Sequence, residues 1–330
     1  MKILVTGGAG YIGGHTCKLL ARAGFEPVVY DNLSTGFRDI ARFGPFEQGD
    51  ILDAARLDNV MARHKPAAVV HFAASAYVGD SVRDPAAYYR NNIVGSLSLL
   101  DAMRRNGIVN IVFSSPCAAY GIPDRMPMHE SLPQAPINPY GFTKLAIEHA
   151  LADYGRAYGI RWIALRYFNA AGADPEGELG ERHDPETHAI PLCIRAALGI
   201  DPGFNVFGSD YPTPDGSAVR DYVHVNDLGD AHVLALRRLL NGGDSAAYNL
   251  GTGIGTSVLE LVAAVEKASG RKVPLTIGPR REGDPPSLFA SAEKAAHDLG
   301  WRAHYRSIDD IVATAVTWAL RQHNAEPRND

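Results

Sequence analysis

The chain contains 330 residues and carries a formal net charge of −5 at pH 7. This length suits one large domain or two fused domains. The charge offers no basic surface for nucleic acid or for an anionic membrane. The three cysteines are widely spaced and odd in number, which favours neither a disulfide framework nor a zinc site. No apolar run approaches the roughly 20 residues of a membrane helix, and a strand at the very start leaves no room for a signal peptide. We therefore expect a cytoplasmic protein.

The first stretch to carry chemistry is a glycine-rich turn. An apolar run at residues 3–6 predicts a buried parallel strand, and Gly7, Gly10 and Gly13 follow it before a helical pattern begins. This spacing is a variant of the dinucleotide-binding fingerprint. A tight glycine turn lets the backbone approach a pyrophosphate, which then meets the positive end of the helix. Glycine clusters also form ordinary turns, but the strand before and the helix after favour a dinucleotide site.

Two acidic residues follow the next predicted strand ends. Asp31 closes the strand at 27–30 and lies eighteen residues after Gly13, where a carboxylate meets the adenosine ribose of a dinucleotide. A carboxylate there repels a 2′-phosphate, so we expect NAD and not NADP. The alternative is an ordinary cap or turn aspartate. Asp50 follows another strand end, where it could accept a hydrogen bond from the adenine amine.

The next strand, 67–72, is apolar and runs into the small residues 73–76, which allow a cofactor to approach the backbone. His71 lies within this strand, and we interpret it as a core histidine with satisfied hydrogen bonds, not as a ligand or base. A long helix is predicted over 85–106, and it carries Asn91, whose amide could reach the cofactor.

Tyr140 and Lys144 form the clearest catalytic candidate. On a helix, residues four apart share one face. A free phenol has a pKa of about 10 and is a poor base at neutral pH, but a nearby ammonium favours the phenolate. Tyr140 would then accept a proton from a sugar or alcohol hydroxyl. The pair could also be an ordinary surface pair. Ser114 and Ser115 directly follow the predicted strand at 109–113. They therefore lie at the carboxyl end of a strand, where open α/β sheets bind ligands.

Strands and helices alternate through residue 168, which predicts an α/β fold with a doubly wound parallel sheet. The segment 173–220 is rich in Pro, Gly, Asp and His, and it is typical of substrate loops. We expect a dinucleotide-binding domain over 1–168 with returning segments near 221–250. A smaller α/β substrate domain would comprise 169–220 and 251–330, ending in a frayed tail from Asn324.

Several motifs together resemble the extended short-chain dehydrogenase/reductase family and, within it, the UDP-glucose 4-epimerases. The resemblance covers essentially the whole chain and implies a Rossmann-type domain, bound NAD and a UDP-sugar substrate. It also implies a homodimer that pairs the helix from Pro85 with the helix of Tyr140. The motifs are Thr6–Gly13, Asp31–Leu33, His71–Ala74, Tyr140 with Lys144, Leu165–Asn169, Val219–Val225 and Arg280–Asp284.

The resemblance implies that Tyr140 takes the proton of the sugar 4-hydroxyl while NAD takes the hydride from C4. The 4-keto sugar would then rotate about its phosphate bonds and receive the hydride back on its other face. Lys144 would hold the nicotinamide ribose and lower the pKa of Tyr140. The implied NAD contacts are Gly7, Gly10, Tyr11, Ile12, Gly13, Asp31, Asn32, Asp50, Ile51, Phe72, Ala73, Ala74, Asn91, Ser114, Tyr140, Lys144 and Tyr167. The implied substrate contacts are Asn169, His188, Phe207, Arg220, Arg281, Asp284 and Leu288.

The chain departs from the family at Pro116. The family usually places a Ser or Thr there, which relays the proton of the sugar hydroxyl, whereas proline has neither a hydroxyl nor a backbone N–H. Either Ser115 or Ser114 takes over this role, with Ser115 the named candidate, or Tyr140 works alone, or the activity is reduced or different.

Two further positions bear on the substrate. Leu288 lies where the family places a residue beside the sugar, and a leucine there implies more room than a tyrosine, so N-acetylated sugars could fit. His188 replaces an asparagine found in some members. The predicted function is reversible C4 inversion of UDP-glucose and UDP-galactose. The alternatives are another nucleotide-sugar 4-epimerase, for UDP-xylose/arabinose, UDP-glucuronate or N-acetylhexosamines, or a catalytically impaired NAD-binding protein.

Overall fold

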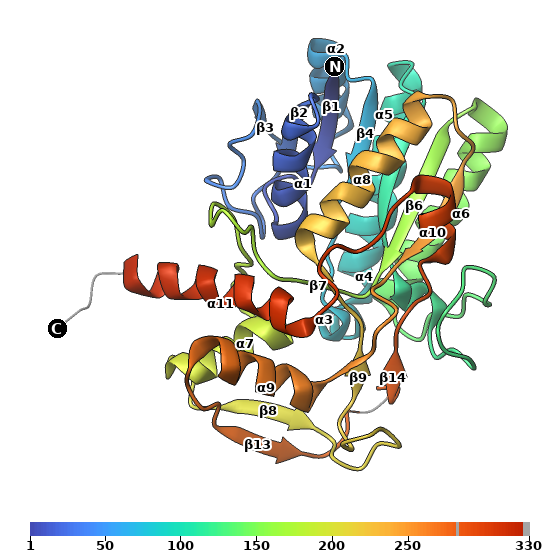
Figure 1. The fold of residues 1–330 in the computed structure, drawn as a ribbon. Helices are drawn as coiled ribbons and strands as arrows, with labels where there is room; N and C mark the ends of the chain where they lie inside the picture. Colours follow the sequence, from blue (N-terminus) through green and yellow to red (C-terminus); the bar gives the residue numbers. More distant parts are fainter. Residues whose placement is uncertain (282–283, 326–330) are drawn as a thin grey trace.

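The computed structural model describes residues 1–281 and 284–325. A seven-stranded sheet lies at the centre of the protein (Figure 1). The strands are all parallel and lie in the order β11-β6-β5-β4-β1-β2-β3. The chain order reverses between β1 and β4, and the crevice beyond the carboxyl ends of such strands is where open α/β sheets bind ligands. The strands are β1 (Lys2–Thr6), β2 (Glu26–Asp31), β3 (Phe46–Gln48), β4 (Ala68–His71), β5 (Asn110–Pro116), β6 (Arg161–Tyr167) and β11 (Ala246–Leu250).

Helices cover both faces of this sheet (Figure 1). Because successive side chains of a strand point to opposite faces, Ile3 and Val5 join one buried core while Leu4 joins the other. The first core contains α1 and α8, and the second contains α2, α5 and α6. The predicted doubly wound sheet is therefore confirmed. The helices are α1 (Tyr11–Arg22), α2 (Ala54–His64), α5 (Gly95–Arg105), α6 (Pro139–Tyr158) and α8 (Val225–Leu240).

The long helix expected over 85–106 is not uniform. It begins as α4 (Pro85–Tyr88), continues as a π-helical segment at Tyr89–Val94 and becomes α5 only at Gly95. Such π segments are rare and often occur at functional sites. A short helix, α3 (Val78–Arg83), precedes α4, and a 3₁₀ turn at Cys117–Tyr120 follows β5.

A third core lies in the carboxyl-terminal part of the chain, at one end of the main sheet (Figure 1). It is built mainly by α7 (Ala189–Leu198), α9 (Val258–Ser269) and α11 (Ile308–Ala325). The parallel pair of β8 (Phe204–Phe207) and β13 (Leu275–Gly278) packs with these helices. The smaller α/β unit predicted from the sequence is thus present.

Short paired strands lie between the main sheet and the carboxyl-terminal core. The pairs are β7 (Asn169–Ala171) with β10 (Tyr222–His224), and β9 (Val219–Arg220) with β12 (Thr256–Ser257) and β14 (Ser287–Leu288). One late helix, α10 (Glu293–Leu299), packs instead against the core of the main sheet, where Ala295 and Leu299 are buried.

The carboxyl-terminal helix corrects one expectation. The frayed tail was expected from Asn324, but α11 continues through residue 325, and residues 326–330 lie outside the described part. Glu282 and Gly283, two members of the Arg280–Asp284 motif, also lie outside the described residues. Within residues 1–281 and 284–325, every helix is too short or too polar to span a bilayer.

Candidate active site

The glycine turn between β1 and α1 is packed too closely for any side chain. Gly7 has a φ of +73°, and a Cβ there would lie 2.6 Å from the backbone nitrogen of Ala73. A Cβ on Gly13 would lie 2.1 Å from the carbonyl oxygen of Gly7. Gly10 caps α1 without a side-chain hydrogen bond. The first amide groups of this helix therefore keep their donors for an anion such as a pyrophosphate.

Asp31 is held directly beside this turn. Its Oδ2 accepts a hydrogen bond from the backbone N–H of Ala9 at 3.0 Å, and its Oδ1 accepts one from Leu33 at 2.8 Å. Burial raises the pKa of the Asp31 carboxyl. Each carboxylate oxygen has further lone pairs, so Asp31 can also accept the two hydroxyls of a ribose. The uncapped helix and this carboxylate together fit NAD.

Asn32 and Asp50 lie side by side at the ends of β2 and β3. The amide of Asn32 donates to Asp50 Oδ2 at 2.9 Å, and the backbone N–H of Leu52 donates to Asp50 Oδ1 at 2.8 Å. Ile51 is buried in the core beneath, 4% exposed, where it packs against Gly95. The structure therefore brings the predicted NAD contacts Asn32 and Asp50 to the same edge of the sheet as Asp31.

His71 is a core histidine, as predicted. It is 2% exposed, with Nδ1 at 2.6 Å from the Thr6 hydroxyl and Nε2 at 2.8 Å from the Ser96 hydroxyl. The strand that carries it delivers Phe72 and Ala73 to the glycine turn, where the backbone N–H groups of both donate to the Thr6 carbonyl. Ala74 follows these two residues in the same turn.

The π-helical segment positions two asparagines over the same region. The predicted cofactor contact Asn91 donates to the hydroxyl of Ser75 at 3.2 Å. Asn92, which the sequence analysis did not single out, is fully buried and holds the backbone of Ser75 through both its N–H and its carbonyl. Asn92 also donates to Thr143 on α6 at 3.0 Å. The only sign of these contacts in the sequence was the adjacent pair of Asn91 and Asn92 in a predicted helix.

Tyr140 and Lys144 both lie in the first turns of α6, but their electrostatics correct the expectation. The Lys144 ammonium lies 6.0 Å from the Tyr140 ring centroid and donates to the Ser114 carbonyl at 3.0 Å. Burial raises the pKa of Tyr140, and the nearby phenols of Tyr167 and Tyr88 raise it further. Burial also lowers the pKa of Lys144 to about 7, against the attraction of Glu148. Burial is the largest cause of both shifts.

Glu148 completes a stripe on α6 at positions i, i+4 and i+8 with Tyr140 and Lys144, a spacing that the sequence contained and the analysis missed. It forms a buried ion pair with Arg166 of β6, with Oε2 at 2.5 Å from Nη2. The hydroxyl of Ser115 donates to the same carboxylate at 2.6 Å. Ser115 therefore belongs to this buried network. This corrects its predicted role as the proton relay, because successive residues of a strand face opposite sides.

Ser114 points the other way, toward Tyr167. Its Oγ lies 2.5 Å from the Tyr167 phenol oxygen, and Ser114 is 9% exposed whereas Ser115 is 1% exposed. Pro116 ends β5 in an extended conformation and pairs in register with Tyr167. Two hydroxyl groups thus lie at the strand ends where the family's usual hydroxyl is missing.

The predicted nucleotide contacts form two pairs in the smaller unit. The guanidinium of Arg281 stacks over the Phe207 ring, 4.0 Å from its centroid. Arg220 makes an ion pair with Asp284 at 3.2 Å and donates to the Pro285 carbonyl at 3.0 Å. The first pair joins β8 to the segment before β14, and the second joins β9 to the same segment.

Three other predicted substrate contacts have local partners. The amide of Asn169 donates to the Asp221 carbonyl at 3.2 Å. His188 contacts the Glu181 carboxylate through Nδ1. Leu288 packs on a small apolar cluster with Cys117 and Phe168, which places it near the end of β5.

Tyr11 differs from its predicted role in one respect. Its hydroxyl donates to the Gly172 carbonyl at 2.6 Å, and the ring is 6% exposed. The side chain therefore fastens α1 to the segment after β7, which leaves the backbone of Tyr11 and the neighbouring Ile12 for the predicted cofactor contact.

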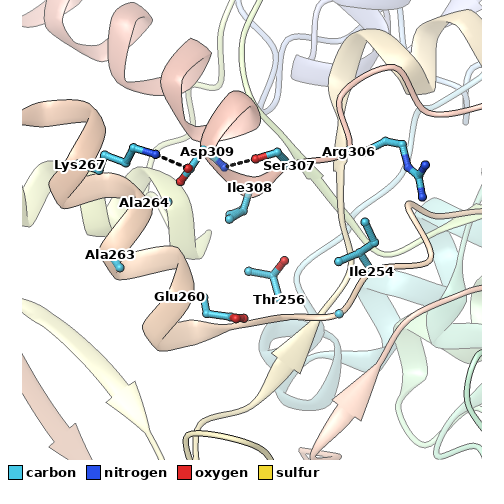
Figure 2. Close-up of a pocket in the computed structure, with 11 residues that line it drawn as sticks. Ile254, Thr256, Glu260, Ala263, Ala264, Lys267, Arg306, Ser307, Ile308 and Asp309 are labelled. Carbon is cyan, nitrogen blue, oxygen red and sulfur yellow. Dashed lines mark hydrogen bonds and ion pairs between the residues drawn. The ribbon is translucent and has the colours of Figure 1, made fainter.

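A hollow of about 760 Å³ lies apart from these groups, between α9 and the start of α11 (Figure 2). Its rim carries the ion pair of Lys267 with Asp309, together with Arg306 and Ile254. None of the predicted site residues lines it, and its mixed lining offers no catalytic group in a useful arrangement.

The fold, the glycine turn beside Asp31 and the contact of Lys144 with the end of β5 define an α/β protein with a dinucleotide site. The chain matches the NAD dependent epimerase/dehydratase family over residues 3–251, and it belongs to that family. It is 57% identical to a UDP-glucose 4-epimerase of Rhizobium leguminosarum bv. trifolii over 321 residues, which are 97% of this chain and 98% of the relative.

Solved structures agree with this assignment. The UDP-glucose 4-epimerase from Brucella ovis in complex with NAD superposes with a TM-score of 0.94 at 56% identity, covering 96% of this chain and 97% of that one. The enzyme from Stenotrophomonas maltophila, with bound NAD and formylated UDP-arabinopyranose, superposes with a TM-score of 0.95 at 41% identity, covering 99% of this chain and 100% of that one. The family and fold class predicted from the sequence are confirmed.

Proposed function

We propose that the protein is an NAD-dependent isomerase that interconverts UDP-glucose and UDP-galactose by inversion at C4. The relatives described above confirm this functional prediction and the NAD cofactor. The observation that carries the residue assignment is the stripe of Tyr140 and Lys144 on α6, at the carboxyl end of β5.

Tyr140 is the base for the sugar 4-hydroxyl in this proposal. When bound, NAD would supply the reversible hydride acceptor for C4. Lys144 is fixed by the Ser114 carbonyl at 3.0 Å and by the attraction of Glu148, so it acts by orienting the nicotinamide ribose. Asp31 and the glycine turn hold the adenosine and pyrophosphate ends.

We propose that Ser114 and Tyr167 together relay the proton, in place of the hydroxyl that position 116 lacks. Both oxygens lie in one short hydrogen bond, which joins the end of β5 to the end of β6. A proton can pass between adjacent hydroxyls. This assignment selects Ser114 from the alternatives of Ser114, Ser115 and Tyr140 alone, because Ser115 already donates to Glu148.

Substrate recognition is assigned to the smaller unit. Phe207 and Arg281 would stack with the uracil and neutralise the diphosphate, with Arg220 as the second cation. Asp284 would meet the uridine ribose, and Asn169 would meet the phosphate or sugar. We accordingly propose an NAD-binding domain over 1–168 with segments near 221–250, and a substrate domain over 169–220 and 251–330. Separate cores support this division, although α10 packs on the first core.

The decisive experiment is incubation of the purified protein with UDP-galactose and no added NAD, followed by anion-exchange chromatography. Formation of UDP-glucose is expected, and it would show that NAD is carried in the protein and that Tyr140 works beside Pro116. A protein that retains NAD but converts neither sugar would contradict the proposal and favour a binding role. Tyr140→Phe should retain NAD and lose activity by about 10²–10⁴-fold. Tyr154→Phe, on the same helix but bonded to Asp101, is the control.

A wider substrate range is supported by Leu288, which is part of the cluster with Cys117 and Phe168. A leucine leaves more space beside the sugar than a tyrosine would. Conversion of UDP-N-acetylglucosamine and of UDP-xylose should be assayed beside UDP-galactose. Leu288→Tyr should lower turnover of the N-acetylated sugar and spare UDP-galactose, and equal losses for both sugars would contradict a steric role.

We further propose a cytoplasmic homodimer. The cytoplasmic location rests on three free, buried cysteines. The dimer rests on large apolar side chains exposed on adjacent segments, with Val82 63%, Val94 53% and Phe142 49% exposed. Tyr89 and Phe142 form an edge-to-face pair that joins the π-helical segment to α6. Sedimentation should give a dimer, and Val94→Glu should shift it toward monomer. A monomeric wild-type protein would contradict this assignment.

A further inference from the structure

We propose that Glu181, His183, Glu186 and His188 form a binding site for a divalent transition-metal ion such as Zn²⁺. The four residues lie in the segment between β7 and α7. One candidate ligand atom from each lies within 4.8 Å of all the others. Two imidazoles and two carboxylates are a donor set that suits four-coordinate Zn²⁺.

The distances around His183 fit a coordination shell better than a hydrogen bond. The Nδ1 atom of His183 lies 3.5 Å from Glu181 Oε1 and 3.5 Å from Glu186 Oε2. It is buried and makes no hydrogen bond in the part of the chain that the structure describes. Ligands of a tetrahedral ion with bonds of about 2.0–2.1 Å are separated by roughly 3.3 Å. An ion between these atoms would give His183 Nδ1 the partner that it lacks.

The two carboxylates are also short of positive charge. The side chains of Glu181 and Glu186 are only 7% and 9% exposed, and their ion-pair partners in the described chain are His183 and His188. Buried carboxylates require a compensating cation or ligand. A divalent ion supplies this charge while leaving both imidazoles neutral, which is the form in which they coordinate a metal.

A nearby acidic cluster shows the contrast. Asp174, Glu176 and Glu178 also lie close together, but all three share the Lys18 ammonium, at 2.7, 2.8 and 2.6 Å. A fixed cation of the protein already occupies that cluster, so it has no comparable need for a metal. Its residues therefore supply matched control variants.

Outer contacts already orient two of the proposed ligands. Glu186 accepts the backbone N–H groups of Thr187 and His188 with Oε1, at 2.8 and 2.9 Å, which leaves Oε2 for the ion. Such contacts fix the direction of a coordinating carboxylate. His188 contacts Glu181 directly, and its side chain is 48% exposed, so the ring can turn aside to admit an ion from solvent. The ion would then tie the N-terminus of α7 to the preceding segment.

The test uses the full-length, tag-free protein with its NAD, dialysed against a chelator and then titrated with Co²⁺. One Co²⁺ per chain with the intense visible absorption of a tetrahedral site is expected, and Zn²⁺ should abolish that absorption by displacement. The midpoint temperature of thermal unfolding should rise when the metal is added. Because absorption is measured without substrate, failure of the metal site and failure of the proposed epimerase function are distinguished.

Substitutions show which side chains bind the ion. His183→Ala and Glu186→Gln should weaken Co²⁺ binding by at least about 100-fold, with NAD content and circular dichroism confirming that each variant is folded. Glu176→Gln, in the cluster neutralised by Lys18, should bind Co²⁺ as the wild type does. Absence of a tetrahedral spectrum would overturn the proposal. So would a spectrum that survives in His183→Ala, or one that is lost only in Glu176→Gln.

Discussion

The hydroxyl oxygen of Ser114 lies 2.5 Å from the phenol oxygen of Tyr167, and this hydrogen bond joins the ends of β5 and β6. If the pair relays the proton of the sugar hydroxyl to Tyr140, removal of either hydroxyl should slow epimerisation. We expect Ser114→Ala and Tyr167→Phe each to lower kcat by about 10²-fold, at the lower end of the effect of general acid–base catalysis. Steady-state kinetics with UDP-galactose measure this.

The double variant distinguishes a shared relay from two separate effects. Groups that act as one unit are not additive, so Ser114→Ala combined with Tyr167→Phe should be about as slow as either single variant. A kcat that stays at the wild-type value in both single variants would disprove the relay. NAD content of each variant, measured after denaturation, shows that cofactor binding is intact.

Pro116 should respond to restoration of a hydroxyl. Its backbone has φ −93° and ψ 155°, an extended conformation that any residue adopts, so substitution should be tolerated. Pro116→Ser is expected to raise kcat by up to about 10²-fold, because it returns an acid–base partner beside Tyr140. Pro116→Ala removes the ring without adding a hydroxyl and should leave kcat near the wild-type value. Equal rates for the serine and alanine variants would contradict a role for the hydroxyl.

The buried ion pair of Glu148 with Arg166 should matter for stability. Both side chains are 6% exposed, and Glu148→Gln leaves the guanidinium without its charge partner. Breaking such a pair costs about 3–5 kcal/mol, measured here as the change in free energy of unfolding in urea. The control is Lys267→Ala, which breaks the exposed pair with Asp309 seen in Figure 2. That change should cost far less, because exposed ion pairs contribute little to stability, and equal losses would argue against burial as the cause.

Acid should destabilise the protein through its buried histidines. Burial lowers the pKa of His71 to about 3 and the pKa of His232 to about 4. Unfolded histidine titrates near 6.5, so below that pH the unfolded chain binds more protons than the folded one. Their contribution to stability is present above pH 6.5 and is lost as the pH falls toward 4. His15 and His224 shift in the same direction.

Each such histidine adds a slope of up to about 1.4 kcal/mol per pH unit to the free energy of unfolding. His71→Gln should therefore flatten the stability profile between pH 6.5 and 4, as measured by urea denaturation at a series of pH values. His323→Gln, at an exposed position of α11, should leave the slope unchanged. A His71→Gln profile as steep as that of the wild type would contradict the assignment.

The sequence was informative wherever chemistry depends on local spacing. The glycines at 7, 10 and 13 predicted the turn, and backbone packing leaves no room for a Cβ at Gly7 and Gly13. The carboxylate of Asp31 was predicted at the strand end that meets this turn, and the structure places it there. His71 was interpreted as a core residue because an apolar strand surrounds it, and both ring nitrogens have hydroxyl partners.

Electrostatics and side-chain direction were less predictable. The spacing of Tyr140 and Lys144 suggested that the lysine lowers the pKa of the phenol, but burial acts on both groups and reverses the direction for Tyr140. Ser114 and Ser115 are adjacent in sequence, yet one faces Tyr167 and the other faces Glu148. Which serine faces the site depends on strand register, and register is set by pairing with β6.

By itself, the sequence determined the order of strands and helices, the dinucleotide turn and the identity of the groups available for catalysis, because these follow from periodicity and spacing along one chain. Which of these groups meet depends on how distant segments pack in the folded chain. Arg220 meets Asp284, and His183 meets Glu181 and Glu186, in a geometry that no local pattern specifies. Burial changes the energy of every charge by an amount that depends on all surrounding segments, and those segments assemble only in the folded protein.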